Sequence, residues 1–417
     1  PNVLKRLEED APDILKYYYI NDELYALPSF SVGAGAYGIP MVWRGDWLKN
    51  VGINKVPETL DEYEDAFYKF TNNDPDGNGK KDTYGLSRTG MLAVFAAYGY
   101  VPTMGQTGTP QGYWMERDGK LVYSSVQPEM KEALARLSKW YKDGVVDPEF
   151  ITGENKGGYW AISHQFVNGI IGFTTHGMSY HWEPKAFVDS DESTSGQDRY
   201  ELEKLDAKAA ESLEVSGIPP YISKETQKTY PKREYVRGER WMFSKELVED
   251  EEKFNKLLEI YNDIYASKEN FDYANSGERG VVWEYEEAVS TNGKTYKRAV
   301  NLGDWKNEEY RKKNKFSFNL FTPSFPDSEK IVTPRDDWAV PRGFDELYMP
   351  NNRLYVSLPS ENTYSAELDK IEEETYIDII TGAKPVDYFD EFVEKWRSSG
   401  GAKLEEEAEA WYREVNE

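Results

Sequence analysis

Apolar and polar residues recur with regular periods along most of the chain. Leu60, Tyr63, Phe67 and Phe70 are spaced to share one face of a helix, which Thr59 and Glu62 would begin as a capping box. Comparable patterns predict further helices over residues 3–9, 128–141, 248–266, 366–381, 388–397 and 403–414.

Other segments have the pattern of strands. The chain is expected to be extended over residues 33–44, 169–176 and 241–243, and to form a β-hairpin over residues 281–299 with its turn at Asn292-Gly293. The polar stretch 190–213 is predicted to be an exposed helical insertion. Because helices and strands alternate without an internal repeat, the sequence predicts an α/β fold.

Composition narrows the possible functions. The chain has 417 residues, enough for about two or three domains, and a net charge of −25. That charge argues against binding to nucleic acid or to an anionic membrane, which both require a basic surface. The longest mostly apolar run, residues 91–101, has about half of the roughly 20 residues that a membrane-spanning helix needs. Since the chain has no cysteine, disulfides and thiol catalysis are excluded.

The segment DPDGNGKKDTYG, residues 74–85, has the spacing of the first half of an EF-hand calcium loop. A glycine stands at the sharp turn in position 6, whereas position 12 is Gly85 instead of the usual bidentate glutamate. The expected ligands of a structural Ca²⁺ ion are side-chain oxygens and backbone carbonyls of Asp74, Asp76, Asn78, Lys80, Asp82 and Thr83. The alternative is an Asp/Asn/Gly turn that holds no metal.

Three sequence stretches together resemble the extracellular solute-binding proteins, family 1, of carbohydrate ABC transporters. These stretches are VWRGDWLKNVGI followed by PETLDEYEDAFYKF and the calcium loop, then FVNGIIGFTTHGMSYHWEP, and finally the helices from ETYIDIITGAKPVDYF to the C-terminus. The similarity is to the larger lipoprotein type, with alginate-binding proteins as relatives. Members of this family have further residues before the equivalent of Pro1, so the signal, the lipid anchor and the opening strands are expected to be missing here.

The resemblance implies a two-lobed fold of the type II periplasmic-binding-protein kind, with a ligand cleft between the lobes and a hinge of strands. The first lobe would contain residues 1–33 and 218–275, and the second lobe residues 34–217 and 276–417. Glycines near the crossings, such as Gly217, Gly277 and Gly280, would absorb backbone change when the lobes close.

Sugars are bound by aromatic rings that stack on their C–H faces and by polar side chains that bond their hydroxyls. The chain has 61 aromatic residues, so most of them must be structural. The candidates for the cleft lie in segments that the resemblance places there, or near crossings and strand ends: Trp182, His176, Trp283, Tyr37, Trp43, Tyr180, Trp160, Trp338 and Arg44. Arg44 and Asp46 could equally well stabilise the lobe.

The resulting hypothesis is a non-enzymatic, monomeric receptor outside the membrane, either a surface lipoprotein or periplasmic. It would bind an oligosaccharide and deliver it to the permease subunits of an ABC importer. Two alternatives remain open. One is a glycoside hydrolase with a carboxylate pair, for which the acids near Trp283 and Trp338 are weak candidates; the other is a glycan adhesin without a transport role.

Overall fold

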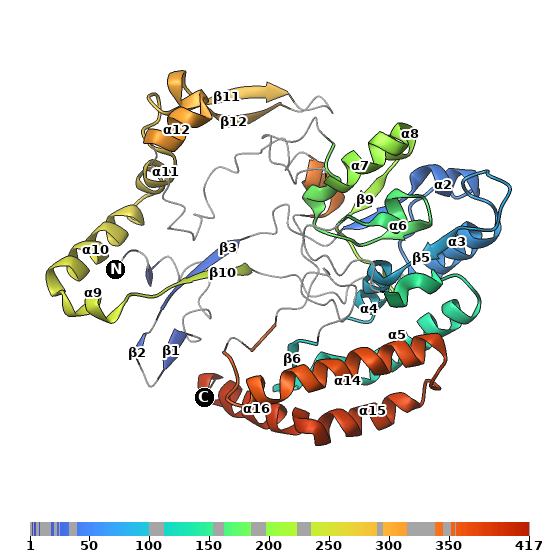
Figure 1. Ribbon diagram of the computed structural model, residues 1–417. Coiled ribbons are helices and arrows are strands. Elements are labelled where there is room, and N and C mark those ends of the chain that lie inside the picture. Colours follow the sequence, from blue (N-terminus) through green and yellow to red (C-terminus); the bar gives the residue numbers. More distant parts are fainter. Residues whose placement is uncertain are drawn as a thin grey trace. The chain divides into compact units, whose positions relative to one another are not determined.

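The computed structural model describes residues 2, 4, 5, 8, 18–20, 23–24, 26–32, 40–99, 112–152, 162–184, 197–222, 235–289, 295–314, 338–344, 352–354 and 356–416. Contacts divide the chain into two compact units (Figure 1). Unit 1 contains residues 1–34 and 234–337, and unit 2 contains residues 35–233 and 338–417. The predicted boundaries of the two lobes differ from the boundaries of these two units. The two lobes therefore stay a prediction.

Unit 2 contains a four-stranded sheet with the strand order β5-β8-β4-β9. Its strands are β4 (Met41–Trp43), β5 (Tyr84–Leu86), β8 (Ile171–Thr174) and β9 (Glu214–Ser216). β5 and β8 run parallel, whereas β4 is antiparallel to both of its neighbours. The carboxyl ends of β5, β8 and β9 therefore lie at the same edge of the sheet as the start of β4.

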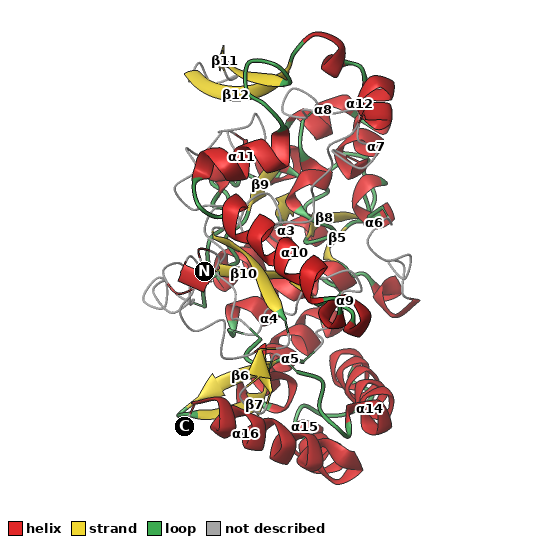
Figure 2. Cartoon of the chain, turned by 90° about the vertical axis from the view of Figure 1, so that its left-hand side faces the viewer, coloured by secondary structure: helices red, strands yellow, loops and turns green. Residues whose placement is uncertain are grey.

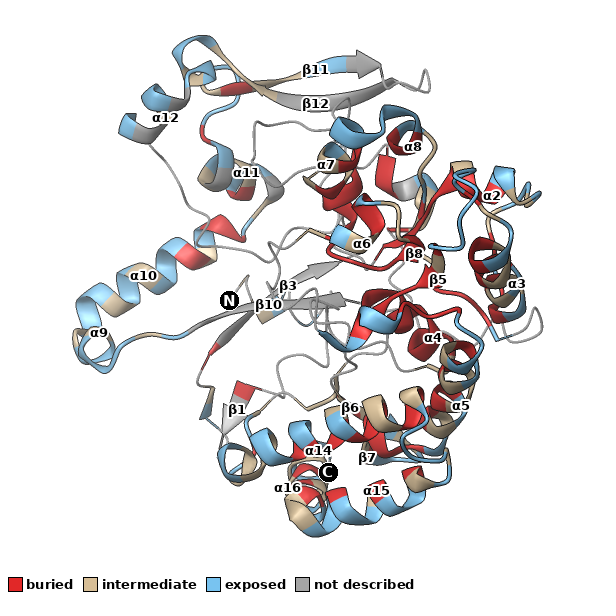
Figure 3. Cartoon of the chain, turned by 45° about the vertical axis from the view of Figure 1, so that its right-hand side comes forward, coloured by how far each residue is buried: buried red, intermediate tan, exposed pale blue. Residues whose placement is uncertain are grey.

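Neighbouring residues of β4 point to opposite faces of this sheet. Trp43 packs against Tyr63, Phe67 and Phe70 of α3 (Leu60–Asn72). Val42 belongs to a second core that also contains Trp182. The residues drawn as buried in Figure 3 follow the strands and the inner sides of the surrounding helices. These helices include α2 (Gly45–Asn50), α4 (Met91–Ala97), α6 (His164–Val167), η6 (Ser179–Trp182), α7 (Gln197–Leu205) and α8 (Ala207–Glu211).

A helical layer that includes the C-terminal segment completes unit 2 (Figure 2). α5 (Pro128–Lys142) packs on α14 (Glu361–Thr381), and α14 packs in turn on α15 (Tyr388–Trp396). α16 (Ala402–Asn416) contacts the second strand of the hairpin formed by β6 (Trp114–Arg117) and β7 (Lys120–Tyr123).

Unit 1 has three two-stranded sheets among its described residues. The pairs are β1 (Tyr19–Ile20) with β2 (Glu23–Leu24), β3 (Leu27–Val32) with β10 (Tyr235–Trp241), and β11 (Trp283–Val289) with β12 (Thr295–Asn301). Its helices include α9 (Lys245–Glu249), α10 (Glu251–Ile264), α11 (Lys268–Ser276) and α12 (Glu308–Asn314).

Local patterns predicted several elements well. The capping box is present, because the backbone N–H of Glu62 donates to Thr59 and the Glu62 carboxylate accepts from the N–H of Thr59. The hairpin and the three C-terminal helices are also confirmed. The predicted helix over residues 248–266 is interrupted at Asp250, whose side chain caps α10 by accepting from the N–H of Lys253.

Residues 190–213 were predicted to be an exposed helical insertion; the described part is helical and largely exposed, but one side of it is buried. Leu202, Ala209 and Ala210 are each at most 2% exposed and belong to the same core as Val42. These apolar residues were overlooked in the sequence because most of their neighbours are charged. They pack α7 and α8 against the sheet.

Candidate functional site

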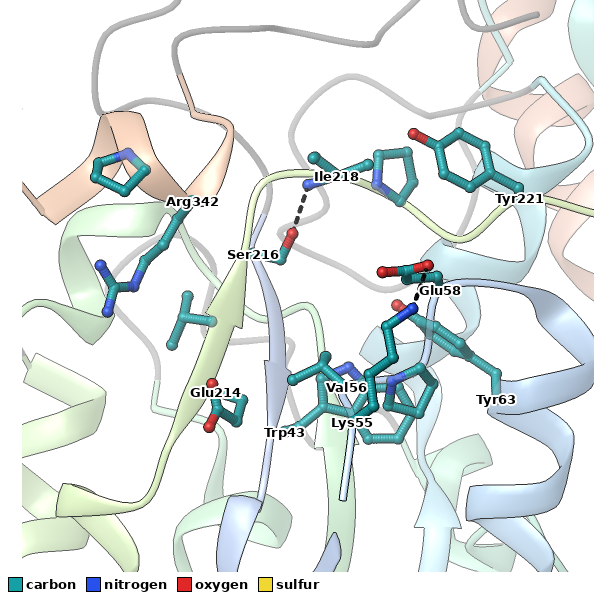
Figure 4. Close-up of a pocket in the computed structure, with 14 residues that line it drawn as sticks. Trp43, Lys55, Val56, Glu58, Tyr63, Glu214, Ser216, Ile218, Tyr221 and Arg342 are labelled. Carbon is teal, nitrogen blue, oxygen red and sulfur yellow. Dashed lines mark hydrogen bonds and ion pairs between the residues drawn. The ribbon is translucent and has the colours of Figure 1, made fainter. Parts of the chain in front are cut away.

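A cavity of about 540 Å³ lies within unit 2, beside the edge strand β9. Four separate parts of the chain line it, and Figure 4 shows how their side chains surround it. The lining residues are Trp43, Lys55, Val56, Pro57, Glu58, Tyr63, Glu214, Val215, Ser216, Ile218, Pro219, Tyr221, Pro341 and Arg342.

The charged groups of this cavity are balanced, with two acids and two bases. Lys55 forms an ion pair with Glu58 at 2.8 Å, and this interaction raises the pKa of the Lys55 ammonium group. Burial lowers the pKa of Arg342, while the negative charge of Glu214 opposes that shift. The cavity therefore suits an uncharged polar or amphipathic ligand better than an anion.

Hydrogen bonds fix the segments that line the cavity. Tyr221 donates its N–H to the carbonyl of Glu58 and accepts from the N–H of Leu60, with N···O distances of 2.9 and 2.8 Å. The Ser216 hydroxyl accepts from the N–H of Ile218 at 3.0 Å. These bonds join the end of β9 to the start of α3.

Two predicted ligand residues at the start of unit 2 are buried. Trp43 has no exposed surface and packs among aromatic rings at the floor of the cavity. Arg44 is 5% exposed and binds the Asp46 carboxylate with two hydrogen bonds of 2.9 and 2.6 Å. Its guanidinium also lies 5.0 Å from the ring centroid of Trp47. The Arg44–Asp46 pair therefore holds β4 against α2, which is one of the two roles predicted for it.

The segment after β8 brings three further candidates together: His176, Tyr180 and Trp182. Each is at most 7% exposed. The Trp182 indole N–H donates to the carbonyl of His176 at 2.9 Å, and its ring packs edge-on against Phe166. This segment lies at the carboxyl edge of the sheet, where ligands bind in open α/β folds. Its side chains contribute to the interior of unit 2 in this structure.

A buried carboxyl group and a buried imidazole lie next to each other where the same segment packs on α7. His181 Nδ1 lies 3.9 Å from Asp198 Oδ2, and Nδ1 also accepts from the N–H of Met178. Burial raises the pKa of Asp198 to about 7 and lowers the pKa of His181 to about 4. Because the acid has the higher pKa, a neutral pair is favoured over an ion pair. The segment therefore packs on α7 without burying two charges.

The remaining predicted residues come from other parts of the chain. Trp283 is 5% exposed in unit 1 and donates its indole N–H to the carbonyl of Gly277. Trp338 is 2% exposed and belongs to the core that contains Trp182. Tyr37 and Trp160 lie outside the described residues. The ligand-binding roles of all these residues stay predictions.

The predicted calcium loop connects α3 to β5 and brings its polar side chains together. The Asp74 carboxylate accepts from the N–H groups of Asn78 and Gly79 at 3.0 and 2.9 Å. The amide group of Asn78 donates to Asp76 at 2.7 Å and to Asp82 at 3.2 Å. Gly79 has a φ of +77°, the conformation for which a glycine was expected at this turn. Hydrogen bonds thus connect Asn78 to Asp76 and Asp82, and connect Asp74 to the backbone of the same turn.

The chemistry of this loop fits a hard cation, although the described residues contain no group of three or more His, Cys, Asp or Glu side chains arranged to hold a metal. Burial raises the pKa of Asp76, and the contact with Asp74 and the charges of Asp82 and Asp74 raise it further. A cation would relieve this repulsion. Thr83 could contribute only its carbonyl, since its hydroxyl is buried and donates to the carbonyl of Phe70.

Sequence reasoning missed most of the cavity. Its four charged residues carry no sequence signal that distinguishes them from other charged residues, and only the three-dimensional fold brings them together. They are Lys55, Glu58, Glu214 and Arg342. Two signals were available: Trp43 was a predicted ligand residue and lines the cavity, and so do Ser216 and Ile218 beside the expected crossing at Gly217.

Comparisons with known proteins identify the relatives of the chain. No family model matches it. It is 25% identical over 416 residues to lipoprotein LipO of Bacillus subtilis strain 168, covering 98% of this chain and 75% of LipO. It is 24% identical over 384 residues to the polygalacturonan/rhamnogalacturonan-binding protein YtcQ of the same strain, covering 90% of this chain and 68% of YtcQ.

Solved structures with the same fold are solute-binding proteins. A human-milk-oligosaccharide-binding protein associated with an ABC transporter of Bifidobacterium longum infantis superposes with a TM-score of 0.59 at 16% identity, covering 99% of this chain and 81% of the other. The alginate-binding protein AlgQ2, solved without calcium ion, superposes with a TM-score of 0.57 at 17% identity, covering 99% of this chain and 79% of AlgQ2.

The fold class predicted from the sequence is therefore confirmed: the chain has the mixed α/β fold of ABC-transporter solute-binding proteins. The resemblance to sugar-binding proteins of this kind is confirmed as well, since the curated relatives include them. In the part of the chain that the structure describes, no helix has both the length and the apolar character needed to span a bilayer.

Proposed function

We propose that this protein is the substrate-binding component of a carbohydrate ABC importer and that it binds an oligosaccharide without modifying it. The observation that carries this proposal is the alignment of 90% of the chain with a polygalacturonan/rhamnogalacturonan-binding protein. The two-unit architecture supports it, because ligand binding between two mobile units is how such receptors change shape.

In this mechanism the ligand shifts a conformational equilibrium. A saccharide that binds the closed form more tightly than the open form increases the closed population in proportion to that difference in affinity. The permease subunits would recognise the closed form. We further propose that the protein works as a monomer outside the membrane, as a surface lipoprotein or in the periplasm, since LipO is named a lipoprotein.

We retain the predicted ligand contacts within this proposal and add Ser216 and Tyr221. The segment from His176 to Trp182 would supply ligand contacts at the carboxyl edge of the sheet. Among the lining residues of the described cavity, Ser216 and Tyr221 are suitable hydrogen-bonding groups for sugar hydroxyls, and the balanced charges of the cavity fit an uncharged glycan.

Calorimetric titration tests the proposal. The panel contains oligogalacturonides, rhamnogalacturonan fragments, kestose and nystose, alginate oligomers and human-milk oligosaccharides, which represent the ligands named for the relatives and structural neighbours. We expect saturable binding to at least one member, with no new reducing ends. New reducing ends would support the hydrolase alternative. The absence of heat and of any thermal shift across the whole panel would support the adhesin alternative.

We also propose that the loop over residues 74–85 holds a structural Ca²⁺ ion. Asp74, Asp76, Asn78 and Asp82 would bind it through side-chain oxygens, with the carbonyls of Lys80 and Thr83 completing the set. The ion would supply positive charge that fixes the connection between α3 and β5. One structural neighbour is an EF-hand mutant of the binding protein FusA of Streptococcus pneumoniae, superposed with a TM-score of 0.53 at 17% identity, covering 100% of this chain and 81% of the other.

Replacing both Asp74 and Asp76 by alanine should lower the melting temperature and remove its dependence on chelator. The parent protein should lose thermal stability in EDTA and regain it with Ca²⁺, because the ion binds only the folded loop. The control variant replaces Asp65 and Glu374, two exposed acids of unit 2, and so removes the same charge. It should remain sensitive to chelator. Equal chelator sensitivity in the Asp74/Asp76 variant would exclude this loop as the site.

A further inference from the structure

Two arginines of unit 2, Arg199 and Arg342, belong to elements that pack on the same core. Arg199 lies on α7, three residues before Leu202 and therefore on the same side of that helix. Leu202 is 1% exposed and shares its core with Trp338 and Phe344, which stand on either side of Arg342 in the chain. The core thus places α7 and the segment 338–344 next to each other.

Arg199 has no protein partner for its charge among the described residues. Its side chain is half-buried, yet it forms no hydrogen bond, ion pair or ring contact there. By contrast, the buried Arg44 and Arg88 each pair with a carboxylate at 2.6 Å. Since a half-buried guanidinium without a counter-ion costs stability, Arg199 calls for an explanation other than packing.

Arg342 ends η10 (Val340–Arg342) and lines the cavity beside β9. Its Nη1 donates to the carbonyl of Trp338 at 2.8 Å, and the guanidinium lies 5.0 Å from the Trp338 ring centroid. A guanidinium has five N–H donors, so most of those on Arg342 have no partner in the part of the chain that is described. In Figure 4 this group lies on the opposite side of β9 from Lys55 and Glu58.

The backbone of Arg342 is fixed in position. Its carbonyl accepts from the N–H of Gly217 at 2.8 Å, and a Cβ atom on Gly217 would lie 2.7 Å from the Phe344 ring. The Phe344 ring in turn stacks on Trp338 at 5.7 Å. Arg342 therefore extends from a rigid support, which reduces the conformational entropy that is lost when a ligand binds to it.

The charges around the two arginines act on them only from a distance. Burial lowers the pKa of Arg199 and the charge of Arg342 lowers it further, whereas Glu203 and Glu211 oppose these effects. Burial also lowers the pKa of Arg342, and Glu214 opposes that shift. Within the described residues, neither arginine forms an ion pair with any of these glutamates. An anion in contact with both guanidinium groups would supply the missing counter-charge.

We propose that Arg199 and Arg342 together bind one carboxylate group of an oligosaccharide that contains uronic acid. This inference rests on the proposed sugar-binding function and adds to it the class of saccharide. Guanidinium groups match a carboxylate through paired N–H donors. The three glutamates exceed the two arginines by one negative charge, which favours a singly charged group over a doubly charged phosphate. Arg199 is not among the lining residues of the cavity, whose balanced charges suit the uncharged rings and hydroxyls of the same ligand.

Calorimetric titration with matched ligands tests the proposal. Oligogalacturonides and alginate oligomers are each used as the free acid and as the methyl ester, which keeps the sugar but removes the charge. The parent should bind at least one free acid about tenfold more tightly than its ester. Arg199→Met should lose this preference and bind the ester as the parent does. Arg413→Met removes the same charge from an exposed site on α16 and should keep the preference.

Thermal unfolding without ligand separates binding from a structural role. Arg199→Met keeps the aliphatic part of the side chain and removes the repulsion with Arg342, so it should be at least as stable as the parent. A less stable Arg199→Met that still prefers the acid would show that the residue is structural and overturn the proposal.

The binding outcomes distinguish this inference from the proposed function. Saturable binding of neutral panel members, with equal affinity for each acid and its ester, would overturn the inference and leave the proposed function standing. The absence of binding by every member would overturn both. A preference of the parent for a sulfated neutral sugar over every uronate would show that the two arginines bind a sulfate ester instead of a carboxylate.

Discussion

Replacing Glu372 by glutamine is expected to raise the free energy of unfolding at pH 7 by about 2–3 kcal/mol. Glu372 lies on α14, is 3% exposed, and accepts a hydrogen bond from the Ser125 hydroxyl at 2.8 Å. Burial raises its pKa to about 8; the bond from Ser125 opposes this shift and the charge of Asp369 adds to it. Glutamine keeps the size and the acceptor for Ser125 without an ionisable group.

The pH dependence of the free energy of unfolding shows whether the buried Glu372 carboxyl group causes the difference between the parent and the variant. Between the ordinary pKa of 4.5 and the folded value of about 8, the unfolded chain has lost the proton that the folded protein retains. The free energy of unfolding of the parent should therefore decrease as pH rises through this window, and the decrease should be smaller in the variant. Urea unfolding at a series of pH values measures this difference. The exposed neighbour Glu374→Gln serves as control and should behave as the parent; a gap for Glu372→Gln that is constant with pH would contradict the account.

Replacing Trp182 by alanine should lower the free energy of unfolding by about 3–5 kcal/mol, because a fully buried indole leaves a large cavity. The change also removes the hydrogen bond to the carbonyl of His176. Trp182→Phe keeps most of the volume and should cost clearly less. Denaturant unfolding of the two variants compares these losses, and a stability of Trp182→Ala equal to that of the parent would show that the side chain is not part of the core.

The same phenylalanine variant tests the proposed ligand contact separately from stability. If the Trp182 ring contacts the saccharide, folded Trp182→Phe should bind more weakly in the calorimetric titration. Unchanged affinity would remove Trp182 from the proposed ligand contacts and leave its structural role.

Sequence reasoning succeeded where a feature depends on neighbouring residues. The capping box at Thr59, the spacing of aspartates from Asp74 to Asp82 and the periodic C-terminal helices are all local patterns. It was less informative for the aromatic residues, because a tryptophan that stacks on a sugar and one that fills a core have the same sequence signature. Trp43 and Trp182 were selected for the first role, and both have no exposed surface here.

Local patterns could not predict the cavity. Glu58, Ser216 and Arg342 are separated by more than a hundred residues from one another, and only the edge of the sheet brings them together. For the same reason, the tight packing around Gly217 could not be distinguished from the flexible glycine that the sequence suggested.

The most direct test of the central claim is native mass spectrometry of the protein mixed with the oligosaccharide panel. The account predicts a complex of one protein with one intact oligosaccharide, and the same oligosaccharide mass after release. Protein that stays free with saturating amounts of every member, or a released sugar that has become shorter, would contradict it.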